Sequence, residues 1–384
     1  MTTEFSRDHT TCSLWGASLL SSVGSLPLHL VPLIVATLIA DSRASVAGAG
    51  LIASAILFGQ LSAALLLPAL GVYSVSRALV FAAAIVLTVG VAISNATEYA
   101  IMLTAWFLVG QCCGVFTYLG TIVASRFSRP AFAFSLRLGI VLIFAGCVSG
   151  LLQLCFRLAS YGDLVTVIVI SLVPIIVSGM VLYQPANVRA GYVCKKVQRI
   201  QTGAFAGLLI VFLFFAGQTG YLSYALQQAV GRGMTFEVTA MSLALMKLSA
   251  GIWVICSSSA GHEDSKSTRF CNLTLVLACS IVALFYSGHI VIFFVALLVI
   301  EMALNKLSSR FQAAVVAEWP EFTGRWLSGI MLLGAASGPP LNGVMISIGL
   351  DGAFVLICVL STFGPLIWQY WNIYRANTVG TVRT

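Results

Sequence analysis

The chain alternates between long apolar stretches and short polar connections. Each apolar stretch has about 20 residues or more, enough to cross roughly 30 Å of hydrocarbon at 1.5 Å per residue. Twelve such segments are expected, at approximately 13–40, 45–70, 76–95, 99–124, 130–154, 163–183, 203–227, 236–257, 270–288, 290–312, 326–348 and 352–373. The first is too long for a signal peptide and lacks a cleavage pattern. The pattern therefore predicts an all-α integral membrane protein with twelve transmembrane helices.

Composition agrees with this prediction and excludes several classes of protein. Hydrophobic residues make up 59% of the chain and charged residues only 8%, whereas a soluble domain carries about 25% charged residues. The net charge of +8 is spread thinly, so no nucleic-acid partner is expected. The ten cysteines are scattered and form neither a disulfide framework nor a zinc spacing. We expect no metal and no cofactor.

Function classes other than transport lack their signatures. An enzyme would need a constellation such as paired catalytic acids or a His-rich metal set, and the four histidines are not grouped, so the chain is not expected to be an enzyme. No Walker motif is present, which argues against ATP-driven transport. No long re-entrant stretch interrupts the spans, as a pore loop would.

The basic residues predict the topology. With both termini in the cytoplasm, fourteen of the 20 Lys and Arg residues lie inside and three lie outside, as the positive-inside rule requires. The polar connection QPANVRAGYVCKKVQRIQT carries four of the inside charges. We therefore expect an N-terminal six-helix bundle at 1–183, a basic cytoplasmic linker at 184–202 and a C-terminal six-helix bundle at 203–384.

One acidic residue, Glu301, lies in the middle of the 290–312 segment. A charge there costs roughly 3 kcal/mol, so such residues usually face a cavity. At about 100° per residue, Asn305, Ser308 and Gln312 share its face, while Lys306 falls opposite and can extend to the interface. The alternative is that Glu301 only pairs with Lys306 or another buried cation as a packing device.

Three further ionisable residues inside the predicted spans are candidates for a functional role. Lys247 lies near the centre of 236–257, too deep for its ammonium to reach the interface easily. Arg137 is about seven residues inside 130–154, so it either faces the cavity or reaches the headgroups. His29 follows a series of serines in 13–40 and is either a packing residue or a proton carrier, because histidine titrates near neutral pH.

Six spans, a basic linker and six more spans resemble the major facilitator superfamily, whose halves are built from inverted repeats. The local motifs match only in part. GVYSVSR at 71–77 lacks the aspartate usual between the second and third spans, and AWFLVGQCCG has Trp106 where arginine is common. The fifth span, GIVLIFAGCVSG, lacks the Gly-Pro motif of many antiporters, but SGPPLNG appears in the eleventh. The resemblance implies a gating helix there, with Gly338, Pro339 and Pro340 as gating residues.

The resemblance also implies that spans 1, 4, 7 and 10 line a central cavity, flanked by spans 2, 5, 8 and 11. Glu301 and His29 are then the proton-coupling candidates. The substrate-binding candidates are Lys247, Arg137, Asn305, Gln111, Tyr118, Gln218 and Tyr221. The cavity charge is neutral to positive, which suits an anionic solute.

We therefore expect a secondary active transporter that moves a small organic solute, anionic or amphiphilic, by alternating access. Proton-coupled efflux is the first expectation, and proton-coupled import or exchange of an organic anion is the alternative. The protein is expected to act as a monomer in the lipid bilayer of the cytoplasmic (inner) membrane of a bacterium. Its other partners are the substrate and protons.

Overall fold

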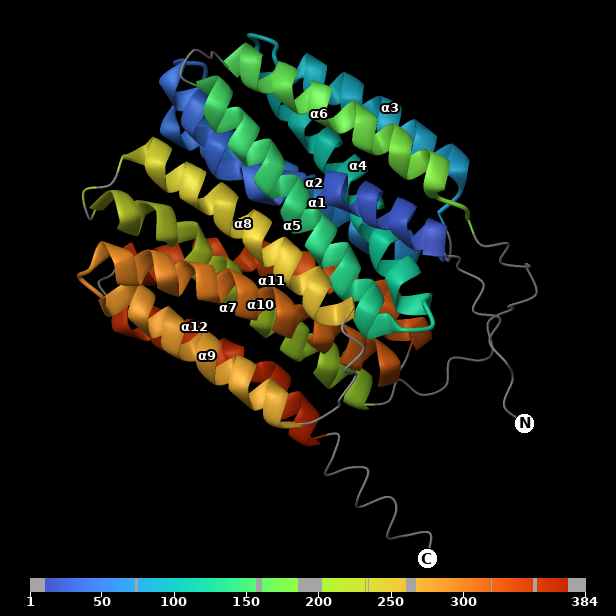
Figure 1. Cartoon of the computed structure of the whole chain (residues 1–384). Coiled ribbons are helices and arrows are strands. Elements are labelled where there is room, and N and C mark those ends of the chain that lie inside the picture. Colours follow the sequence, from blue (N-terminus) through green and yellow to red (C-terminus); the bar gives the residue numbers. More distant parts are fainter. Residues whose placement is uncertain are drawn as a thin grey trace, which may run out of the picture.

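The computed structural model describes residues 11–72, 75–156, 161–185, 202–231, 233, 235–259, 267–318, 320–347 and 351–371. Within these ranges the regular structure is helical throughout and comprises twelve helices (Figure 1). They are α1 (Thr11–Ala40), α2 (Val46–Ala69), α3 (Arg77–Ile93), α4 (Tyr99–Arg126), α5 (Pro130–Phe156), α6 (Tyr161–Leu182), α7 (Thr202–Gly231), α8 (Phe236–Ser259), α9 (Ser267–Tyr286), α10 (Ile290–Glu318), α11 (Pro320–Ser347) and α12 (Asp351–Thr362).

The surface of this helical array is apolar. Among the described residues, six helices contain stretches long and apolar enough to cross a membrane. Four more contain shorter apolar stretches. Large hydrophobic side chains such as Phe58, Ile170 and Val181 are exposed. Helices satisfy their own backbone hydrogen bonds, which lipid requires because it offers none. The chain is a multi-pass membrane protein.

The helix boundaries differ from the apolar pattern mainly at the polar ends. α10 continues past the predicted end at 312 to Glu318, and α11 begins at Pro320 instead of 326. Hydropathy marks the hydrocarbon part of a helix, but a helix can continue into the polar layer. Proline is favoured at the first helical position, since its missing N–H has no partner to lose there. α12 ends at Thr362, and residues 364–371 are helical again after a turn at Phe363.

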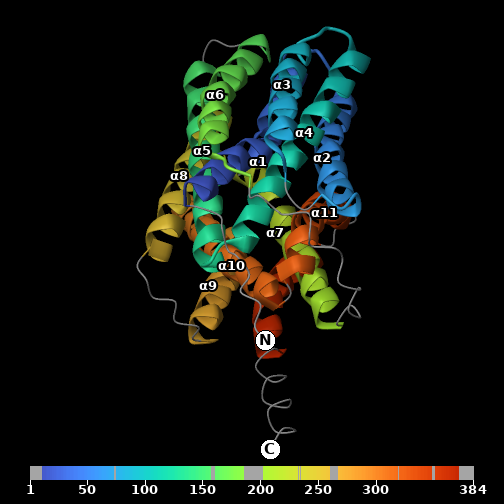
Figure 2. The same ribbon diagram turned by 90° about the vertical axis from the view of Figure 1, so that its right-hand side faces the viewer.

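Most helices among α1 to α6 pack mainly on one another, as do most among α7 to α12, whereas α5 and α8 pack most extensively on each other (Figures 1 and 2). Among the described residues, the most extensive contacts between the two sets join α5 with α8, α5 with α10, α2 with α11, and α4 with α11. The contact of α5 with α8 is the most extensive of these, and glycines bring the two backbones together. A side-chain carbon on Gly146, for example, would lie 2.8 Å from the carbonyl oxygen of Ala244.

The two sets are closed against each other at the end where α4 ends and α5 begins, which we call the α4–α5 end. There Ser135 Oγ of α5 donates to Ser309 Oγ of α10 at 3.0 Å, and both residues are buried. Gly324 of α11 fits against Ser125 of α4, because a side-chain carbon would lie 2.7 Å from its Oγ. A small apolar cluster of Leu61, Ala64, Leu65 and Leu332 joins α2 to α11 nearby.

Two tyrosines fix the connection between α2 and α3 at the same end. The Tyr118 hydroxyl donates to the Val72 carbonyl at 2.6 Å, and the Tyr183 hydroxyl donates to the Val75 carbonyl at 2.7 Å. Arg77 donates in turn to the Tyr183 carbonyl at 3.1 Å. Burial raises the pKa of Tyr183 to about 12, so its hydroxyl remains a donor at neutral pH.

Candidate functional site

Four of the residues singled out in the sequence lie together between the two helix sets: His29 of α1, Lys247 of α8, and Glu301 and Asn305 of α10. Lys247 Nζ lies 3.5 Å from Glu301 Oε1 and 3.3 Å from His29 Nδ1. An ammonium only donates hydrogen bonds, so Nδ1 accepts and the imidazole proton is on Nε2. The lysine therefore connects α1, which belongs to the first set, with α10, which belongs to the second.

Asn305 fixes the carboxylate from the other side. Its Nδ2 donates to the Glu301 carbonyl at 2.7 Å and to Glu301 Oε2 at 3.2 Å. The spacing of four residues puts the two side chains on consecutive turns of α10. One carboxylate oxygen thus faces the amide, and the other faces Lys247.

The ion pair has an accessible and an inaccessible partner. The side chain of Lys247 is 14% exposed and that of Glu301 is 3% exposed. Their separation of 3.5 Å is longer than the roughly 2.7–2.9 Å of a tight charge-assisted hydrogen bond. An incoming anion would therefore meet the ammonium first, and it would compete with Glu301 for it.

Lys306 differs from the expectation that it reaches the interface. It is 6% exposed, and its Nζ donates to Ser258 Oγ of α8 at 2.6 Å. The expected polar face of α10 is partly satisfied within the helix, because Gln312 Nε2 donates to Ser308 Oγ at 2.8 Å. Lys247, and not Lys306, is thus the cation beside Glu301.

Arg137 lies apart from this cluster and does not extend to the headgroups. It is 2% exposed, and its Nε donates to Ser21 Oγ of α1 at 2.8 Å. Gly120 of α4 makes room for it, since a side-chain carbon there would lie 3.1 Å from Nε. Ser21 precedes His29 by eight residues, which is about 12 Å along α1. Arg137 Nη1 is buried without a partner.

Three other substrate-binding candidates are not in the cluster. Tyr118 is buried and its hydroxyl donates to the Val72 carbonyl, so it does not contact this cluster. Gln218 of α7 is also buried and donates from Nε2 to Ser361 Oγ of α12 at 3.2 Å, away from α1 and α8. Gln111 of α4 contacts Ser62 Oγ of α2 at 3.5 Å. In all three cases the hydrogen-bond partner belongs to the same helix set.

The gating candidates lie on α11, and one of them can be described. Gly338 is buried against α7, where a side-chain carbon would lie 2.5 Å from Thr219 Oγ1. The side chains of Tyr221, Pro339 and Pro340 lie outside the described residues, although their backbones belong to α7 and α11.

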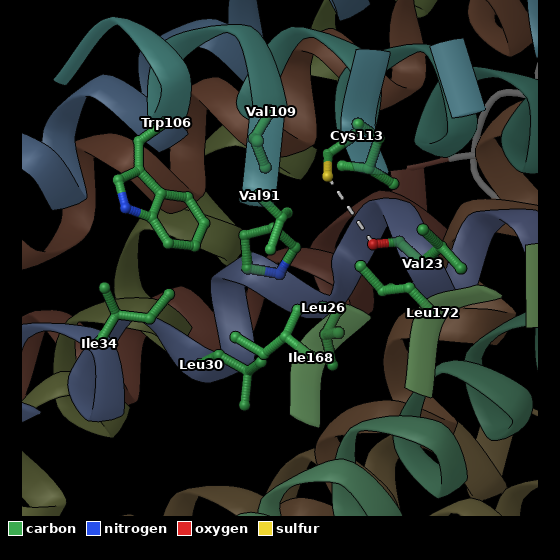
Figure 3. A pocket seen from close by; sticks show the side chains of 12 residues that line it. Val23, Leu26, Leu30, Ile34, Val91, Trp106, Val109, Cys113, Ile168 and Leu172 are labelled. Carbon is green, nitrogen blue, oxygen red and sulfur yellow. Dashed lines mark hydrogen bonds between the residues drawn. The ribbon is translucent and has the colours of Figure 1, made fainter. Parts of the chain in front are cut away.

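A small apolar pocket lies between α1, α3, α4 and α6 (Figure 3). Pro27, one of its lining residues, has no N–H to donate to the carbonyl of Val23 four residues earlier. Cys113 of α4 takes that role, with its Sγ 3.8 Å from the Val23 oxygen (Figure 3). Buried residues such as Trp106, Leu26 and Leu172 complete the lining, so this pocket offers no charge to a solute.

Sequence reasoning missed the serines that work with these groups. Ser21 accepts from Arg137, and Ser135 and Ser309 form the contact between the two sets. Serine is common at helix contacts in membranes, so neither its identity nor its periodicity distinguishes these positions from ordinary packing sites.

Comparison with solved structures identifies the fold. The human organic anion transporter MFSD10 (TETRAN) matches with a TM-score of 0.74 at 13% identity, over 93% of this chain and 98% of that one. The major facilitator superfamily proton:xylose symporter XylE matches with a TM-score of 0.70 at 11% identity, over 94% and 96%. The E. coli fucose:proton symporter FucP matches with a TM-score of 0.63 at 15% identity, over 94% and 98%. No protein-family model and no curated protein matches the sequence. The chain has the major facilitator superfamily fold.

Proposed function

We propose that the chain is a secondary active transporter in which Lys247 binds an anionic organic solute and Glu301 binds the accompanying proton. The two helix sets correspond to the six-helix bundles at 1–183 and 203–384, with the linker at 184–202. Both termini are cytoplasmic, which puts the α4–α5 end on the cytoplasmic side. The protein acts as a monomer in the cytoplasmic membrane and performs no enzymatic step.

The observation that carries this proposal is the shared ammonium. While Glu301 is ionised, its carboxylate is paired with the Lys247 ammonium, 3.5 Å away. When Glu301 takes up a proton, the attraction disappears and Lys247 carries an uncompensated charge in a site of low dielectric constant, which favours an anion. Proton and anion therefore bind together rather than in turn.

Joint binding favours cotransport over efflux by exchange with protons. In an antiporter the proton and the solute exclude each other, whereas here protonation of Glu301 makes the cation available to the solute. This supports the alternative expected from the sequence, proton-coupled movement of an organic anion, over proton-coupled efflux. An inward proton gradient would drive such a solute into the cell.

His29 and the Ser135–Ser309 contact link solute binding to the conformational change of the transport cycle. His29 joins the N-terminal bundle to Lys247 at 3.3 Å, so displacement of Lys247 loosens a contact between the bundles. The Ser135–Ser309 contact and the Gly324 contact keep the cytoplasmic side closed in this conformation. Alternating access requires these contacts to separate. Gly338, Pro339 and Pro340 adjust α11 against α7 during that movement.

Structural neighbours support the class of function. MFSD10 is described as an organic anion transporter and XylE as a proton:xylose symporter, so this fold serves both anions and proton coupling. Sequence identities of 13% and 11% are too low to assign the solute of either protein to this chain. The anion preference rests on Lys247.

Uptake into proteoliposomes tests the proposal. Purified protein is reconstituted, and labelled hippurate and succinate are added with and without a pH gradient that is acid outside, beside the neutral amide of hippurate and the cation choline. We expect at least one carboxylate to accumulate above its external concentration when the gradient is imposed, beyond the level in protein-free liposomes. Accumulation of choline in place of both carboxylates would overturn the anion assignment. Carboxylate uptake without response to the gradient would overturn the coupling.

A further inference from the structure

Arg137 is a buried cation that the transport step at Lys247 does not use. It is 2% exposed, and within the described part of the chain it has no acidic partner. Its Nε is satisfied by Ser21, but its Nη1 is buried with no hydrogen-bond partner. An unpaired guanidinium in a membrane interior is costly, so such groups usually serve a ligand or a pathway.

A second unsatisfied polar group lies one helical turn away on α1. Ser18 is 1% exposed and its Oγ is also buried without a partner. Ser18 and Ser21 are three residues apart, so they are neighbours on the helix surface. Ser22, by contrast, donates to the Leu19 carbonyl at 2.7 Å and is satisfied within the helix.

These residues lie between the central cluster and the closed α4–α5 end, which the proposed topology makes cytoplasmic. Ser18 and His29 are eleven residues apart, which returns to nearly the same face of α1. Ser21 lies about 12 Å from His29 along the helix, on the side of the closed α4–α5 end. Arg137 itself is only two residues from Ser135, whose contact with Ser309 holds that end closed.

We propose that Arg137, Ser18 and Ser21 form a second anion subsite, which receives the carboxylate of the solute on the cytoplasmic side of the central cluster. The inference rests on the proposed function and adds a second binding position on the same transport path. The residues of α1 that these two cations contact, His29 and Ser21, are about two helical turns apart. A carboxylate can therefore pass from Lys247 to Arg137 without becoming fully desolvated between them. When the serine contact separates, the unpartnered Nη1 and the Ser18 hydroxyl become available to it.

Equilibrium binding tests the subsite directly. Purified protein in nanodiscs is titrated with labelled hippurate, with its neutral amide as the chemical control. We expect Arg137→Gln to weaken hippurate binding by about tenfold or more, the scale of a charge-assisted hydrogen bond. Arg137→Lys keeps the charge but not the fork of donors and should bind with intermediate affinity.

Serine variants provide a matched pair that avoids any folding defect of the arginine variants. Ser18→Ala removes a hydroxyl without a partner, so it should leave thermal stability unchanged while it weakens hippurate binding severalfold. Ser22→Ala, one turn of the same helix away, should leave hippurate binding unchanged.

The hippurate-binding results distinguish one central site from two subsites. Binding that is lost in Lys247→Gln but unchanged in both Arg137→Gln and Ser18→Ala means one central site, and it overturns the second subsite. Absence of hippurate binding to the wild-type protein overturns it as well. Binding that depends on Arg137 in a protein that transports no carboxylate would keep the subsite and reject the proposed function.

Discussion

Replacing Lys247 with methionine removes the cation while keeping a side chain of similar length, and it leaves Glu301 buried with Asn305 as its remaining donor. At 3.5 Å, two unit charges attract by about 5 kcal/mol at an effective dielectric constant of about 20. Removing one partner of a buried pair costs about 3–5 kcal/mol, because the other charge stays desolvated. We expect Lys247→Met to lower stability by about 3 kcal/mol at neutral pH.

The reverse change, Glu301→Gln, should cost less. The stranded group is then Lys247, whose side chain is 14% exposed and keeps its contact with His29. The double variant, which leaves neither charge stranded, should be more stable than Lys247→Met alone.

Thermal unfolding in detergent, monitored by size-exclusion chromatography, measures this cycle in the wild-type protein, the two single variants and the double variant. Equal and additive losses in the two single variants would mean that Lys247 and Glu301 do not interact, and the shared-ammonium account would then fail. A pair that serves only packing would instead give the predicted stabilities while hippurate uptake remained unchanged in well-folded Lys247→Gln.

Three further predictions follow from other contacts. His29→Ala removes the acceptor that joins α1 to Lys247, but it should leave uptake responsive to the pH gradient because Glu301 still carries the proton; loss of that response in liposome uptake would make His29 the proton site. Ser135→Cys with Ser309→Cys should form a disulfide on oxidation, since the two hydroxyl oxygens are 3.0 Å apart, and uptake should stop until a reductant is added, whereas each single variant stays active. Tyr183→Phe should lower stability by about 1 kcal/mol, the net value of its hydrogen bond to Val75, and an unchanged unfolding temperature would show that this bond does not hold the α2–α3 connection.

The sequence predicts the helices, and it singles out charged residues that the structure brings together. Apolar segments of bilayer length predicted the helices because lipid imposes that length. Glu301 and Lys247 stood out because a charge in hydrocarbon is costly enough to be rare. The face shared by Glu301 and Asn305 followed from helical periodicity, and the structure has the two side chains in contact.

The pairing of side chains on different helices could not be predicted in the same way. Periodicity gives the face of a helix but not the neighbour opposite that face. Tyr118 and Gln218 looked like cavity residues, yet their hydrogen bonds are made to Val72 and Ser361. Lys306 was expected at the interface, but Ser258 of α8 offers it an acceptor inside. These outcomes depend on the packing of distant segments.

The central claim, that Glu301 carries the proton while Lys247 carries the anion, is tested most directly by comparing exchange with accumulation in Glu301→Gln proteoliposomes. Glutamine cannot bind or release the proton, but it leaves Lys247 available to a carboxylate. The account predicts that the variant exchanges internal for external labelled carboxylate and no longer accumulates it against a gradient when the outside is acid. Accumulation driven by the pH gradient at the wild-type level in this variant would contradict the account.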